Sequence, residues 1–285
     1  MNGRMSGRSA SGILLTSLVL FSIGCSRDYQ AERELWKVEK SAQDVLAHPS
    51  AVDEARFDQL VRRVRDLAER FRGSQAAARA WFGLGQLYAA RKNFSGSQEA
   101  FRQLIENYSD QPMLVIKAYV ATAKLYEIQQ KWPEAEAAYR QLFAYAPWSM
   151  DGMKVPLYVA QVKSEGDKKE PSAAYKEAVD IYKRLSQEAP QAPLELQVKR
   201  YLAVALEQSG DWREAVRILE ALKQNVDGVD RAGVLFELAM LYHNRQGDPQ
   251  QAANMLRTLA DEFPEHPLGK AAAAQLARMN LKKSP

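Results

Sequence analysis

Apolar residues recur at helical spacing along most of the chain, and no stretch alternates between apolar and polar positions as a half-buried strand does. The clearest stripe has apolar residues three or four positions apart, at Phe57, Leu60, Val61, Val64, Leu67 and Phe71. The stretches "APQAP" (189–193) and "FPEHP" (263–267) each place one proline after a helical pattern and a second where the next one starts. Proline ends a helix and is well accepted in the first turn of the next. The pattern therefore predicts an all-α chain of helices joined by short turns.

A repeat is visible in the small residues at the start of every second predicted helix. They are Ser97, Ala135, Ala178, Ala215 and Ala252, with spacings of 38, 43, 37 and 37 residues. Residues of the preceding helix that we expect to face them are also small, namely Gly85, Ala123, Ala203 and Ala239. Two helices approach to about 8–10 Å only where the crossing residues allow it. The spacing predicts five helical hairpins, each crossing at a small residue.

The segment Trp81–Tyr88 matches W-x2-L-G-x2-Y and resembles the first helix of a tetratricopeptide repeat. The resemblance implies a right-handed superhelical solenoid, in which stacked hairpins share a continuous core. We assign residues 76–265 to the repeat array. Residues 31–75 are predicted to form a degenerate N-terminal hairpin, and residues 266–285 a capping helix with a tail.

The N-terminal segment has the layout of a secretory signal. Arg4 and Arg8 precede an uncharged, mostly apolar run over 13–23, which ends just before Cys25. The residues before Cys25 resemble the lipobox of bacterial lipoproteins, with Ser22 where that family prefers leucine. The resemblance implies a signal peptide over 1–24, a lipidated Cys25 and a leash over 25–30. The alternative is an ordinary secretory signal that happens to end in cysteine.

Composition and motifs exclude several functional classes. Lys and Arg total 39 against 35 Asp and Glu, a net charge of +4, and no window carries the basic stripe expected of a nucleic-acid site. A single cysteine rules out an internal disulfide, and the three histidines are far apart. We find no P-loop, nucleophile elbow or HExxH motif. The sequence therefore predicts a protein that is not an enzyme and that has no metal, no cofactor and no small-molecule substrate. The one attached group that we expect is the covalent lipid on Cys25.

In tetratricopeptide repeats, the first helix of each pair lines a concave groove. Carried onto this chain, the resemblance assigns the groove to Arg79, Phe82, Gln86, Lys117, Val120, Lys124, Arg200, Val204, Phe236, Met240 and His243. This mixture suits an extended peptide that carries apolar anchors and a carboxylate. The alternative is that Phe82 and Phe236 pack between helices and that the cations are simply solvated.

Two irregular segments interrupt the pattern. Residues 163–171 ("KSEGDKKEP") form a polar insertion, which we expect to be a linker within the third repeat. Residues 146–156 carry Trp148, Met150 and Met153 between repeats. Apolar loop residues can mark a contact site, but tryptophan is usually largely buried, so we expect Trp148 to pack on the repeats.

Over most of its mature length the chain resembles tetratricopeptide outer-membrane lipoproteins of the BamD type, which assemble barrel proteins. The carriers of this resemblance are Cys25, the five repeats and the turn "FPEHPLGKAAAAQLA". It implies a scaffold anchored by lipid in the outer membrane, facing the periplasm, whose partners are other envelope proteins. Supporting roles in pilus secretion, polysaccharide export or cell-wall coordination remain open, as does that of an enzyme accessory.

Overall fold

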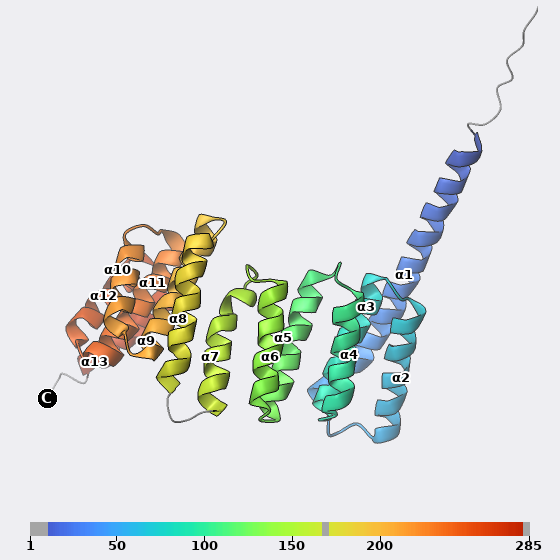
Figure 1. The fold of residues 1–285 in the computed structure, drawn as a ribbon, viewed down its shortest axis with the longest axis horizontal. Coiled ribbons are helices and arrows are strands. Elements are labelled where there is room, and N and C mark those ends of the chain that lie inside the picture. Colours follow the sequence, from blue (N-terminus) through green and yellow to red (C-terminus); the bar gives the residue numbers. More distant parts are fainter. Residues whose placement is uncertain (1–10, 167–170, 282–285) are drawn as a thin grey trace, which may run out of the picture. The chain divides into compact units, whose positions relative to one another are not determined.

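A computed structural model describes residues 11–166 and 171–281, with side chains from Arg27 onward. Thirteen α-helices, and no strand, occur in these residues (Figure 1). The first seven helices are α1 (Ser11–Ala47), α2 (Glu54–Arg70), α3 (Gln75–Ala90), α4 (Phe94–Asn107), α5 (Pro112–Ile128), α6 (Trp132–Tyr145) and α7 (Val155–Gly166). The others are α8 (Pro171–Glu188), α9 (Ala192–Ser209), α10 (Trp212–Lys223), α11 (Gly228–Leu241), α12 (Pro249–Glu262) and α13 (Pro267–Leu281). A 3₁₀ turn, Gly152–Lys154, precedes α7, and a π-helical turn, Tyr242–Gln246, follows α11. The predicted all-α fold of paired helices is confirmed.

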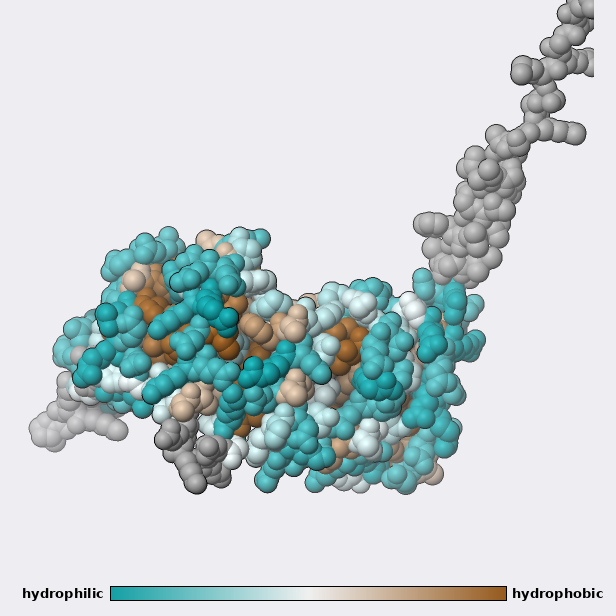
Figure 2. Space-filling model, in the orientation of Figure 1, coloured by the Kyte–Doolittle hydropathy of each residue, from teal (hydrophilic) through white to brown (hydrophobic). Residues whose placement is uncertain are grey.

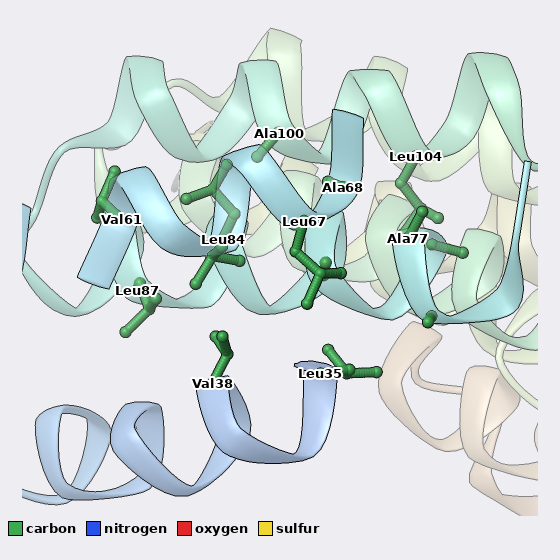
Figure 3. Close-up of a cluster of buried hydrophobic side chains, with 14 of the residues drawn as sticks. Leu35, Val38, Val61, Leu67, Ala68, Ala77, Leu84, Leu87, Ala100 and Leu104 are labelled. Atoms are coloured by element: carbon green, nitrogen blue, oxygen red, sulfur yellow. The ribbon is translucent and has the colours of Figure 1, made fainter. Parts of the chain in front are cut away.

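The chain divides into two compact units, residues 1–138 and 139–285. In the first unit, α3 packs against α1, α2, α4 and α5, and α1 also packs against α2. Leu35 and Val38 of α1 point toward the buried leucines of α2 and α3 (Figure 3). The N-terminal half of this unit thus has its own helical pair, α1 with α2, in the region predicted as a hairpin.

Side-chain caps fix where α2, α3 and α4 begin. The side chain of Asp53 accepts a hydrogen bond from the backbone N–H of Arg56, which opens α2. Ser74 and Asn93 cap α3 and α4 in the same way. Each cap satisfies a backbone donor that has no partner inside its helix.

Close crossing of paired helices is clearest between α3 and α4. The hydroxyl of Ser97 donates to the carbonyl oxygen of Gly85 over 2.7 Å. A Cβ atom on Gly85 would lie 2.4 Å from the Phe101 ring, so only glycine fits at this point. The five predicted small residues are all buried, at 0–1% exposure: Ser97, Ala135, Ala178, Ala215 and Ala252. The predicted burial of the five small residues is therefore confirmed, and the predicted crossing is confirmed between Gly85 and Ser97.

In the second unit, neighbouring helices pack in sequence from α7 to α13, and α13 also contacts α11. The buried hydroxyl of Tyr182 donates to the carbonyl oxygen of Met153 over 2.8 Å and ties α8 to the turn before α7. Gly210, with a φ of 102°, ends α9 in the left-handed conformation that glycine adopts without strain. Hydrophobic residues gather in patches around α8 and α10 on the face seen in Figure 2, whereas α2 is mainly hydrophilic.

The two irregular segments, 146–156 and 163–171, contain both buried and exposed residues. Trp148 is half-buried against the core of the second unit, and Met153 is fully buried, so the expected packing of Trp148 is confirmed. Met150 remains exposed. In the insertion, residues 163–166 complete α7 and Pro171 begins α8, while 167–170 lie outside the described residues.

The N-terminal predictions fall partly outside the described residues. Residues 1–10 of the predicted signal peptide are not described, nor is the side chain of Cys25. The predicted leash, 25–30, belongs to the backbone of α1, and its residues from Arg27 to Gln30 are exposed. No helix among the described residues is both long enough and apolar enough to cross a membrane.

Candidate functional site

The first unit contains a cavity of about 390 Å³, which we call the α1–α3–α5 groove. Four predicted groove residues line it: Arg79, Phe82 and Gln86 on α3, and Lys117 on α5. They lie on successive turns of one helix and on the neighbouring first helix of the next pair. The structure therefore brings together the N-terminal part of the predicted set.

One wall of the α1–α3–α5 groove was not predicted. It comes from α1, whose Leu35, Val38, Ala42 and Leu46 line the cavity. The predicted repeat array begins only at residue 76, after α1. The spacing of these four residues by three or four positions is an amphipathic signal that could have identified the wall. Most of the groove surface is consequently apolar.

Arg79 is neutralised within the chain. Its guanidinium donates to Glu32 Oε2 over 3.0 Å and to Glu39 Oε1 over 2.7 Å, both on α1. Because one cation faces two carboxylates, Arg79 fastens α1 to α3 and leaves no net positive charge for a ligand. Lys117, in contrast, is exposed at the groove and makes no ion pair among the described residues.

Phe82 combines the two roles considered from the sequence. Its ring lies 5.6 Å from that of Phe101 on α4, measured between centroids, so it packs between helices. It is only half-buried and also lines the groove. Gln86, one turn further on, is exposed. The groove thus presents a fixed aromatic edge beside a free amide.

Val120 and Lys124, the other predicted residues of α5, are not among the residues that line this cavity. Val120 is half-buried. Lys124 is exposed and forms an ion pair with Glu127, with 2.8 Å between Nζ and Oε2.

The second unit has a smaller hollow of about 110 Å³. Val204, Phe236 and Met240 line it. Arg200 does not line the hollow. Its guanidinium Nε lies 3.1 Å from Glu237 Oε1, so this cation is also paired within the chain. His243 is exposed in the turn after α11.

The first unit also has a polar hollow of about 540 Å³ between α2, α3 and α4. This hollow was not predicted. Trp81, Tyr88, Arg65 and Glu99 are among its lining residues. The guanidinium of Arg65 donates to the Tyr88 hydroxyl over 2.8 Å. Trp81 and Tyr88 belong to the repeat motif, in which aromatic residues pack between helices. The motif therefore does not predict a hollow beside them.

No group of three or more His, Cys, Asp or Glu side chains among the described residues is placed to hold a metal ion. The lowered pKa of Glu177 follows from the hydrogen bond donated by Lys163, and that of Glu262 from Arg231; both are surface ion pairs. What the site residues can provide is a shaped binding surface.

Solved structures with a similar fold include two that are described as tetratricopeptide repeat proteins, and the identities are low. BtubC from P. vanneervenii is 18% identical, with a TM-score of 0.42, over 83% of this chain and 94% of that one. YrrB, described as a TPR protein with an unusual peptide-binding site, is 15% identical with a TM-score of 0.38, over 69% and 92% of the two chains. NprR in complex with its cognate peptide NprX is 12% identical with a TM-score of 0.39, over 87% and 71%. At these scores the similarities carry no conclusion about the site.

No curated protein matches the chain. Two models of the tetratricopeptide repeat match it, one over residues 49–112 and the other over 234–266. The first match covers α2, α3 and α4, and the second covers most of α11 and α12. The chain thus carries tetratricopeptide repeats in both of its compact units.

Proposed function

We propose that this protein is a lipid-anchored scaffold of the bacterial cell envelope that binds a segment of a partner protein in the α1–α3–α5 groove. The observation that carries the proposal is the groove itself, in which apolar side chains of α1 and Phe82 of α3 surround an open cavity beside Lys117. Apolar pockets with a few polar groups at the edge are the usual form of a site for a bound segment.

The ion pairs around the groove show which of its cations remain available to a bound partner segment. Arg79 is occupied by Glu32 and Glu39, and Lys124 by Glu127. Lys117 is therefore the cation left to meet a carboxylate of the partner. We expect the segment to be held chiefly by apolar anchors, with a single acidic contact at Lys117.

The anchor is the second part of the proposal. The layout around Cys25 supports lipidation there, and two or more acyl chains make membrane residence stable. A tethered scaffold raises the effective concentration of its partners at one surface. Assembly of outer-membrane barrel proteins is the process that we propose to test first.

The experiment is a crosslinked pull-down of the full-length protein from envelope membranes, identified by mass spectrometry, beside a Cys25→Ala variant. The proposal predicts an envelope protein that is captured by the wild type and lost or reduced in the variant. Radiolabelled palmitate should enter the wild type and not Cys25→Ala. Capture that is equal in both variants, with no palmitate in either, would contradict the anchor.

The groove is tested separately, by charge reversal. Lys117→Glu should reduce capture of the partner about fivefold or less, since one exposed ion pair contributes about 1 kcal/mol or less. Lys131→Glu is the matched control, because Lys131 is exposed in the same unit and lies outside the groove. Equal capture by the two variants would remove the acidic contact from the proposal.

A further inference from the structure

The N-terminal helix α1 has an exposed face that no described helix covers. Tyr29 is 69% exposed and Trp36 is 64% exposed, the highest values for any aromatic residue among the described part of the chain. Arg33 and Lys40 are exposed as well. Residues 29, 33, 36 and 40 are spaced by four, three and four positions, so they form one stripe along the helix. We call this set the α1 outer stripe.

The charges of α1 are sorted between two faces. Its acidic residues Glu32 and Glu39 turn toward Arg79 of α3, and Glu34 pairs with Lys37 over 2.7 Å. The two cations of the outer stripe make no ion pair among the described residues, and Lys40 lies 5.9 Å from the ring centroid of Trp36. The outward face of α1 thus carries two aromatic residues and two cations, with the exposed Asp44 one turn beyond Lys40, although the helix as a whole has four cations against five acidic residues.

We infer that the α1 outer stripe lies on an anionic phospholipid surface, with Trp36 and Tyr29 in the headgroup region and with Arg33 and Lys40 reaching the phosphates. Tryptophan and tyrosine favour the membrane–water interface because each has an apolar body and a polar tip. Lysine and arginine extend their charged ends toward the headgroups. Each cation near an anionic surface contributes about a fivefold preference for it.

The position of the stripe in the chain agrees with a membrane surface. The inference rests on the proposed anchor at Cys25, because α1 runs on without a break from that residue. At the helical rise, Tyr29 is about 6 Å and Trp36 about 17 Å along the axis from Cys25. A lipid at Cys25 would thus hold both aromatic residues within reach of the interface.

A second copy of the chain is a poorer occupant of this face. A two-fold contact places the same patch on both sides of an interface. The cations Arg33 and Lys40 of one copy would then lie close to those of the other, and juxtaposed like charges weaken an interface. A surface of phosphate headgroups meets the cations with the opposite charge.

The test measures the depth of Trp36 in vesicles. The full-length chain is reconstituted into vesicles of phosphatidylethanolamine and phosphatidylglycerol that contain brominated lipid, which quenches nearby tryptophans. Co-sedimentation with the vesicles is measured for each variant, and quenching is compared only in the vesicle-bound fraction, so the readout reports the stripe and not the anchor. One of the five tryptophans should be quenched. Trp36→Phe should abolish that quenching, whereas Trp212→Phe, which removes a half-buried tryptophan of the second unit, should leave it intact.

A charge-reversed pair tests the lipid chemistry. Arg33→Glu with Lys40→Glu should lower Trp36 quenching at least fivefold in vesicles with phosphatidylglycerol. Lys183→Glu with Arg184→Glu is the control, since both residues are exposed on α8. Quenching that survives Trp36→Phe, or a Trp36-dependent dimer in detergent, would overturn the inference. Failure of palmitate labelling at Cys25 would refute the proposed anchor instead, and this is a separate result.

Discussion

The close approach of α3 and α4 at Gly85 provides a direct test of the repeat packing. Gly83 and Gly85 lie two residues apart on α3. A Cβ atom on Gly85 would lie 2.4 Å from the Phe101 ring, whereas one on Gly83 would meet no atom within 4 Å. Alanine replacements at the two positions therefore gain the same helix propensity. They differ in packing, because the added methyl group clashes at position 85 and meets open space at position 83.

The magnitudes follow from that difference. Replacing glycine by alanine inside a helix favours folding by about 1 kcal/mol. At Gly83 this gain should appear almost unopposed. At Gly85 the methyl group must displace a ring that is 1% exposed and already packed against Phe82. Overpacking a core costs about 1–3 kcal/mol, so we expect Gly83→Ala to exceed Gly85→Ala by roughly 2 kcal/mol in local stability.

Hydrogen exchange of the α3 and α4 amides is the appropriate assay, because repeat arrays open locally and do not unfold in one step. A difference of 2 kcal/mol corresponds to about thirtyfold faster exchange in Gly85→Ala. Amides of α11 and α12 in the second unit provide the internal reference. Equal exchange in the two variants would refute the close crossing of α3 and α4.

Three further predictions concern buried and paired side chains. Ala135→Trp places a large ring at a fully buried site and should lower the melting temperature through local unfolding; an unchanged melt would disprove the assigned repeat register. Tyr182→Phe leaves the buried carbonyl of Met153 without its donor and should cost about 1–2 kcal/mol in urea denaturation, and a cost near zero would mean that this bond does not form. Hydrogen bonding from Lys163 holds the pKa of Glu177 below its usual 4.5, so its contribution to stability is present above pH 4.5 and is lost as the pH falls through the folded pKa. Glu177→Gln should flatten that part of a urea-midpoint profile against pH. The effect should be under about 1 kcal/mol, because the pair is partly exposed to solvent, and an identical profile would contradict the pairing.

The repeat could be predicted because its requirements are local. A close helix crossing needs a small residue at one place in each hairpin, and that need recurs at a fixed spacing. Ser97 and Ala135 were found in this way, and so was the glycine at position 85. The aromatic and proline positions around them follow the same logic. The starts of α3 and α4 follow from the caps Ser74 and Asn93, which are readable from the sequence.

The electrostatics of the groove could not be predicted, because they depend on residues distant in sequence. Arg79 meets Glu32 and Glu39, which are 47 and 40 positions away. A position rule for one repeat cannot tell whether a cation is free or already paired. The α1 wall of the groove could not be predicted for the same reason, because its residues line the cavity only once α1 has packed on α3.

Site-specific crosslinking in intact cells tests the central claim most directly. A photo-reactive amino acid at position 86, in place of the exposed Gln86 of the groove, is compared with the same group in place of Asp58, which is exposed on α2. The proposal predicts one envelope protein that crosslinks to position 86 and not to position 58, and that disappears in the Cys25→Ala background. Crosslinks at position 58 alone, or none at position 86 in membranes where the pull-down captures a partner, would show that the groove is not the binding surface.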